Sequence, residues 1–134
     1  MNAERHLTAD ECLELLGDQH VGRLAVIVGG RPEIFPVNYV RDGESVVFRT
    51  NSGTKLSATT QGEVAFEVDL IDHRTASGWS VVVHGIAQEV TDADRADIQE
   101  RLRSLPLGVW AGGDRPHLMR IAPREITGRH VGPG

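Results

Sequence analysis

The chain repeatedly sets a run of β-forming residues beside a two-residue turn signal. Arg23–Val28 ends at Gly29-Gly30, and the return run Glu33–Val40 is followed by Asp42-Gly43. Such glycine-containing pairs favour the tight turns that join antiparallel strands. Further along, Glu63–Ile71 alternates its side chains cleanly between two faces, as a half-buried strand does. The pattern therefore predicts antiparallel strands joined by successive hairpins, and closure into a small barrel would leave no exposed edges.

The same signals divide the whole chain into a mainly β protein with short helices. We expect six or seven strands, drawn from residues 23–28, 33–40, 45–50, 63–71, 79–90, 117–122 and 125–131. We expect two or three helices, at residues 9–16, 55–60 and from 91 to a stop at Pro106. Neither a repeat nor a linker interrupts the pattern, so residues 1–134 are predicted to form one domain.

Several residues predict local geometry. Thr8 and Glu11 have the spacing of a helix capping box, and Gly17 stands where a left-handed glycine would end that helix. Pro36 lacks an amide hydrogen, which indicates an edge position or a bulge. Gly85 indicates a bulge or bend within its strand.

Composition excludes several classes of function. The net charge is −5, which argues against a general nucleic-acid surface. Cys12 is the single cysteine, so neither an internal disulfide nor a four-cysteine zinc site can form, and we expect it to be a small core residue. The longest apolar runs, Leu24–Val28 and Val81–Val83, are far too short to span a membrane. No signal peptide is visible, so we expect a cytoplasmic protein.

Motifs for metal, nucleophilic or nucleotide chemistry are missing. The six histidines do not have the spacing of metal ligands, and we expect no catalytic metal. The sequence contains neither a Gly-x-Ser-x-Gly elbow nor a complete Walker motif. No catalytic side chain is assigned.

The segment from Phe48 to Lys55 is the best candidate for binding an anion. Arg49 and Lys55 supply two cations, Thr50 and Thr54 supply hydroxyl groups, and Gly53 allows the backbone to turn. A helix that starts near Thr54 would point amide groups at the same place. These features suit a phosphate, and the alternative is a polar hairpin loop with two solvated cations.

Two other segments have both a structural and a functional interpretation. Trp79 is either an aromatic of the core or of a dimer interface, or a wall for a planar ring. We interpret His84 as a strand histidine whose hydrogen bonds are satisfied. Pro36 leaves a neighbouring backbone group free for a ligand, or it simply protects an edge.

Together these segments resemble the pyridoxamine 5′-phosphate oxidase-like flavoproteins. The resemblance rests on the order of Gly22-Arg23-Leu24-Ala25, Pro36-Val37-Asn38-Tyr39, Phe48-Arg49-Thr50 with Lys55, and Gly78–Gly85. It extends from about Cys12 to Arg129. It implies a split β-barrel that binds FMN between the two subunits of a homodimer.

The resemblance also implies roles for particular residues. Arg49, Thr50, Thr54 and Lys55 would hold the phosphate and ribityl chain of FMN. Pro36, Val37 and Asn38 would lie along the edge of the isoalloxazine, with Ser80 in contact with the ring and Trp79 beside it.

The activity implied is that of an FMN-dependent oxidoreductase acting on a small molecule. Hydride would reach flavin N5 from a reduced nicotinamide or a substrate and would leave to oxygen or an organic acceptor. The authentic oxidases carry a C-terminal segment that grips the substrate's phosphate, and we expect this chain to lack it. One alternative on the same fold is a reductase that uses the deazaflavin F420. Another is a non-enzymatic dimer that binds flavin, binds haem through His73 or His84, or carries no ligand.

Overall fold

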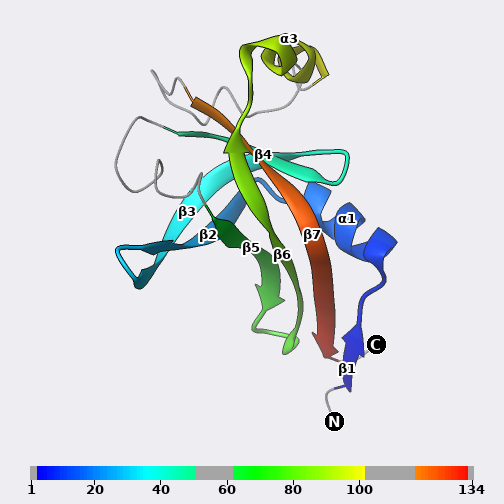
Figure 1. Ribbon diagram of the computed structural model, residues 1–134. Coiled ribbons are helices and arrows are strands. Elements are labelled where there is room, and N and C mark those ends of the chain that lie inside the picture. The colour runs from blue at the N-terminus through cyan, green and yellow to red at the C-terminus, as the bar shows by residue number, and fades with distance from the viewer. Residues whose placement is uncertain (1–2, 51–61, 102–116, 133–134) are drawn as a thin grey trace.

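The computed structural model describes residues 3–50, 62–101 and 117–132 (Figure 1). Seven strands and two helices are found in these ranges: β1 (Ala3–His6), α1 (Ala9–Gly17), β2 (Val21–Val28), β3 (Arg31–Asp42), β4 (Ser45–Thr50), β5 (Glu63–Asp72), β6 (Ser77–Glu89), α3 (Asp92–Arg101) and β7 (His117–Gly132). Every strand pairing is antiparallel. Neither helix is long and apolar enough to cross a membrane.

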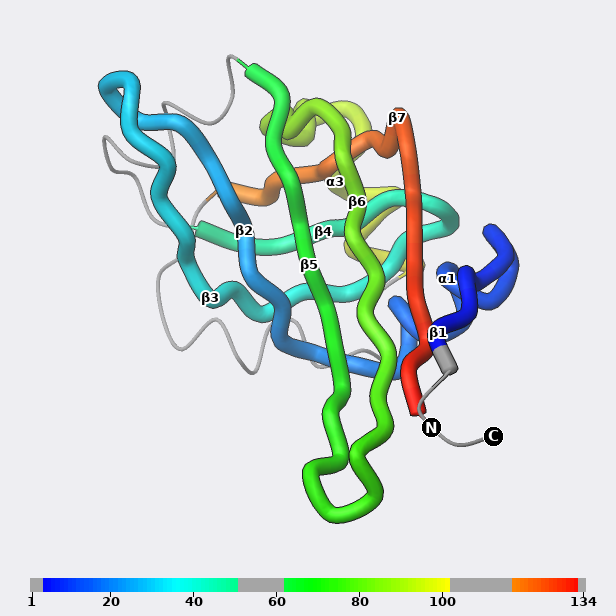
Figure 2. Tube along the Cα trace, turned by 90° about the horizontal axis from the view of Figure 1, so that it is seen from below, coloured from blue at the N-terminus to red at the C-terminus, as the bar shows by residue number. Residues whose placement is uncertain are grey.

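Six of the strands close into a ring. The order β7-β4-β3-β2-β5-β6 runs around the sheet, and a further pairing of β6 with β7 closes it. Figure 2 shows the molecule from below, with β2, β5 and β6 side by side. The other edge of β7 is shared, because its first half pairs with β4 and its last residues pair with β1. This division of one long strand confirms the prediction of a mainly β split barrel.

The predicted turns are confirmed. Gly29, Gly30 and Gly43 all have positive φ angles, of 57°, 78° and 62°, as the tight hairpins require. The Thr8 hydroxyl accepts from the Glu11 amide and the Glu11 carboxylate accepts from the Thr8 amide, so the capping box is present as well.

Two local predictions are wrong, and one strand was not predicted. Gly17 is the last residue of α1, and its φ angle is not positive. The helix ends instead at Asp18, which has ordinary helical backbone angles and donates its amide hydrogen to the Leu15 carbonyl. The two C-terminal strands are one continuous strand, β7. The polar N-terminal segment forms β1, whose pairing depends on backbone hydrogen bonds and leaves no apolar pattern in the sequence.

A bulge explains why β7 was predicted as two strands. His84 pairs with Glu125 but Gly85 pairs with Pro123, so Arg124 is an extra residue on β7. The prediction of an irregularity at Gly85 is therefore confirmed. A Cβ atom there would lie 2.2 Å from the carbonyl oxygen of Ala122, so only glycine fits.

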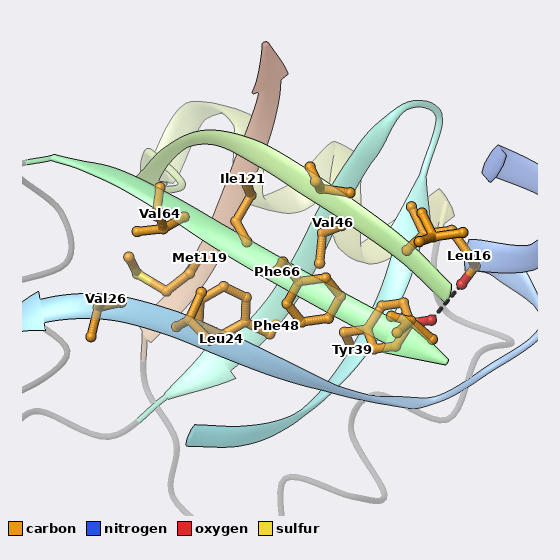
Figure 3. Close-up of a cluster of buried hydrophobic side chains, with 14 of the residues drawn as sticks. Leu16, Leu24, Val26, Tyr39, Val46, Phe48, Val64, Phe66, Met119 and Ile121 are labelled. Atoms are coloured by element: carbon orange, nitrogen blue, oxygen red, sulfur yellow. Dashed lines mark hydrogen bonds between the residues drawn. The ribbon is translucent and has the colours of Figure 1, made fainter. Parts of the chain in front are cut away.

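The barrel interior is the main core. Tyr39 donates its hydroxyl hydrogen to the Leu16 carbonyl, which ties α1 to β3 (Figure 3). The Tyr39 ring also meets Phe66 edge to face, with centroids 4.9 Å apart. Cys12 is fully buried here, as predicted.

A second and smaller core lies on the outside of the barrel, under α3. Its members are apolar residues of β3, β4, β7, α3 and the segment before α3: Val40, Val47, Val90, Ile98 and Leu118. Arg101 of α3 forms two hydrogen bonds with Asp42, at 3.0 and 2.7 Å, which fixes the helix over this cluster.

The predicted helix 55–60, the end of the second helix at Pro106 and the Trp110 loop lie outside the described residues.

Candidate functional site

The hairpin of β3 and β4 opens at the end away from its turn. Its pairing runs from Asp42–Ser45 to Tyr39–Phe48 and then stops, whereas β4 continues to pair with β7 as far as Thr50. Residues 36–38 of β3 therefore pair only with β2 among the described strands. Pro36 lies on this edge, as predicted, and the edge has backbone groups that no described strand pairs with.

Strand alternation divides the predicted cofactor residues between two faces. Pro36, Asn38 and Arg49 share the outer face of the barrel with Val40 and Val47 of the small core. Val37 and Thr50 share the interior face instead. Val37 packs against the main core, and Thr50 is only 4% exposed. The side chains of Val37 and Thr50 point into the barrel, so only the backbone of these two residues could contact a ligand on the outer face.

Arg49 carries an unmet hydrogen-bonding requirement. Its Nε is buried and has no hydrogen-bond partner. A buried cationic donor without a partner is costly, so such a group suits a site that an anion fills. The planar guanidinium fits the two oxygens of a phosphate or carboxylate.

Trp79 and Ser80 lie in another part of the barrel. In the sheet order β3-β2-β5-β6, Ser80 is three strands from Asn38, or about 14 Å around the outer face. Trp79 shares the interior face and packs against the main core, which agrees with its structural interpretation. One chain therefore does not bring Ser80 and Asn38 together.

Thr54 and Lys55 lie outside the described residues, so their predicted role stays a prediction.

A charged group that the sequence reasoning missed lies between these two parts. Arg23 of β2 contacts both Glu67, at 3.3 Å, and Asp69, at 2.8 Å, on β5. Burial, followed by the hydrogen bond with Asp69, raises the pKa of Glu67 to about 7. That hydrogen bond and the Arg23 guanidinium lower the pKa of Asp69. Only the pairing of β2 with β5, which is not local in sequence, brings the three together.

The outer face beyond this charged group is apolar and hollowed. Ile27 and Ile34 are 59% and 67% exposed. Beside Ile27 is an open hollow of about 230 Å³, lined by Ala25, Val26, Ile27, Pro32, Glu63, Val64, Ala65 and His84. Exposed apolar surface around a hollow is typical of a contact surface.

His84 departs from its prediction as a satisfied strand histidine. Its Nδ1 is buried without a hydrogen bond, and a carboxylate oxygen of Glu125 is 3.7 Å away. Among residues 3–50, 62–101 and 117–132, no cluster of three or more histidine, cysteine or acidic side chains has the arrangement of a metal site.

The closed ring of strands and the long shared strand β7 define a split barrel, and comparison with known proteins agrees. The sequence profile of the family described as "Pyridoxamine 5′-phosphate oxidase" matches residues 8–130. An uncharacterized protein of Mycobacterium tuberculosis is 33% identical over 131 residues, which is 93% of this chain and 84% of the relative.

Two solved structures are similar over nearly the whole chain. A FAD-binding protein from Mycobacterium smegmatis is 36% identical, with a TM-score of 0.73, and covers 96% of this chain and 98% of its own. A FAD-binding protein from Mesorhizobium loti is 25% identical, with a TM-score of 0.81, and covers 99% and 100%. The chain belongs to the pyridoxamine 5′-phosphate oxidase family.

Proposed function

We propose that this chain is a flavin-dependent oxidoreductase that holds the phosphate of FMN with Arg49. The observation that carries the proposal is the buried Arg49 Nε without a partner, next to the open edge of β3. Family membership and the FAD-binding relatives support a flavin as the ligand. FAD contains the same riboflavin phosphate unit, and those two relatives make it the second candidate.

The residues of this chain would bind and orient the ring. Arg49 would hold the phosphate, and the free edge at Pro36, Val37 and Asn38 would line the isoalloxazine. A bound flavin supplies hydride transfer itself, which agrees with the absence of a recognisable catalytic motif in the sequence. The protein's own part is to position the reacting groups and to exclude water.

We also propose that the working form is a homodimer with the cofactor between its subunits. The separation of Ser80 from Asn38 supports this, because a second copy is needed to place both at one ring. The exposed apolar residues Ile27 and Ile34 beside a hollow support the same face as the contact.

The test of the ligand is a titration of purified protein with FMN, FAD, F420 and hemin in parallel. We expect saturable quenching of flavin fluorescence and a shifted visible spectrum with FMN or FAD. Binding of F420 alone would replace the flavin, a Soret band alone would favour a haem protein, and no binding at all would refute the proposal.

The test of the dimer is its mass in solution by light scattering. Ile34→Lys should convert a dimer into a monomer, because it buries a charge in the contact. Leu70→Lys is the matched control. Leu70 is also exposed, but on β5 it is on the side of Val64, Phe66 and Val68, whereas Ile34 lies on the outer face of the barrel. A monomeric wild-type protein, or a dimer that Ile34→Lys leaves intact, would contradict the proposed contact.

A further inference from the structure

We propose that Arg120 is a second cation of the flavin phosphate site and acts beside Arg49. This inference rests on the proposed function and deepens it. No motif in the sequence indicated Arg120, which lies in a strand of ordinary composition.

The pairing of β4 with β7 places the two arginines on one face. Arg49 is opposite Leu118, and Val47 is opposite Arg120. The two arginines are thus diagonal neighbours on adjacent strands, about 7–8 Å apart, which long side chains span easily. Leu118 and Val47 belong to the small outer core, so this is also the face that carries Asn38.

Arg120 has the same unmet requirement as Arg49. Its Nε is buried without a hydrogen-bond partner. Five other described arginines have carboxylates within 4 Å: Arg5, Arg23, Arg101, Arg124 and Arg129. Two neighbouring guanidinium groups with no acid among the described residues repel each other, and a shared anion would remove this cost.

The acids around Arg120 are already engaged. The pKa of Asp42 is lowered mainly by its hydrogen bonds to Arg101, with a smaller contribution from the field of Arg120. Glu89 lies 2.7 Å from His117, and Asp94 accepts from the Thr91 hydroxyl at 3.2 Å. Arg120 makes an ion pair with none of these three acids.

Space is available next to Arg120. It borders a polar hollow of about 80 Å³ together with Gln88, Glu89, Val90, Thr91 and Asp94. One side of the arginine is therefore not held by packed side chains. None of the other lining residues belongs to β4, so this hollow lies on the β6 and α3 side of Arg120. Two guanidinium forks at diagonal positions on adjacent strands can still hold one phosphate from two sides.

The chemistry recognised is a phosphate ester of riboflavin, with either one phosphate or two. Two guanidinium forks match the charge and the several oxygens of a dianion better than one fork does. FMN and FAD share this group, and comparing them with riboflavin, which has no phosphate, isolates it.

The experiment measures the dissociation constants of riboflavin, FMN and FAD for the wild-type protein and for Arg120→Ala. We expect the affinity for FMN or FAD to fall about ten- to a hundredfold, and that for riboflavin to stay the same. Arg124→Ala is the matched control, because Arg124 is an exposed arginine of the same strand, 3.7 Å from Glu63. It should bind all three ligands as the wild type does.

The outcomes separate this inference from the proposed function. A wild-type protein that binds no flavin refutes the proposed function and this inference with it. If the wild type binds FMN and the folded Arg120→Ala variant binds it equally tightly, the role of Arg120 is refuted and the proposed function is not. Equal losses for riboflavin and FMN would show a structural role and would also refute it. Arg120→Met, which keeps an apolar stem, replaces the alanine variant if that variant does not fold.

Discussion

The barrel carries two charged regions on its outer face, and they differ in how their charges are satisfied. Over β2 and β5, Arg23 is held by two acids, Glu67 and Asp69. Over β4 and β7, the Nε atoms of Arg49 and Arg120 are buried with no partner. The first region is complete within one chain. The second has cations with no anion among the described residues.

The difference separates stability from binding. A charged group that has its partners contributes to folding, and removing one partner leaves the others exposed to the cost of burial. A buried guanidinium nitrogen with no partner among the described residues adds nothing to the stability of the fold, and it gains a hydrogen bond only when an anion binds. The same type of residue is therefore expected to behave in opposite ways at the two places.

The largest expected effect is on the β4–β7 side. Arg49→Glu should weaken FMN binding at least a hundredfold, because it replaces attraction for the phosphate with repulsion, and Arg49→Ala about ten- to a hundredfold. Fluorescence titration measures both. Lys55→Ala should act in the same direction as Arg49→Ala.

The control for Arg49 is the stability of the flavin-free protein. Urea unfolding of Arg49→Met should give a free energy equal to or above that of the wild type, because Arg49 forms no ion pair with residues 3–50, 62–101 or 117–132. A clear loss of stability together with unchanged FMN affinity would make Arg49 a structural residue.

The second effect is on the β2–β5 side and has the opposite character. Arg23→Met should lower the free energy of unfolding by about 1–2 kcal/mol, since two half-buried acids lose their counter-charge. Urea unfolding at pH 8 measures it. A loss no larger than that of Arg49→Met would remove the distinction between the two regions.

These two regions also show how far the sequence reaches. The hairpins, β4 and the capping box follow from local signals, since each depends on residues within a few positions of one another. Arg49 was found in the same way, within a segment rich in hydroxyl groups and cations. The family resemblance supplied the split barrel, which local patterns alone left as a small barrel.

What sequence reasoning missed depends on pairings between distant strands. Glu67 and Asp69 meet Arg23 only because β5 pairs with β2, and Arg120 lies beside Arg49 only because β7 pairs with β4. The β1 strand has the same cause, since it is fixed by the edge of β7 that it joins rather than by its own residues. The irregularity was predicted at Gly85, but its extra residue, Arg124 on β7, also depends on such a pairing. Satisfied and unsatisfied charges look alike in a sequence.

The smallest effect is a pH dependence that only the satisfied region should show. The pKa of Glu67 is about 7 in the folded chain, above its usual value of 4.5. The folded state therefore binds the Glu67 proton more tightly than the unfolded state does. The contribution of Glu67 to the free energy of unfolding is greatest at low pH and is lost as the pH rises from about 4.5 to about 7. Asp69, whose pKa is lowered, acts in the opposite sense only as the pH falls through its own lower range.

The measurement compares urea unfolding of the wild type and Glu67→Gln between pH 5 and pH 8. Over that range the wild type should lose about 1 kcal/mol more than the variant, after allowance for solvent screening of a partly exposed group. Glu63→Gln, on the same strand and face, should keep the wild-type slope. Because the histidines are unchanged in all three proteins, their titration cancels in the comparison. If Glu67→Gln keeps the wild-type slope, the Glu67 carboxyl does not hold a proton in this pH range. Glu67 and Asp69 then behave as ordinary surface carboxylates.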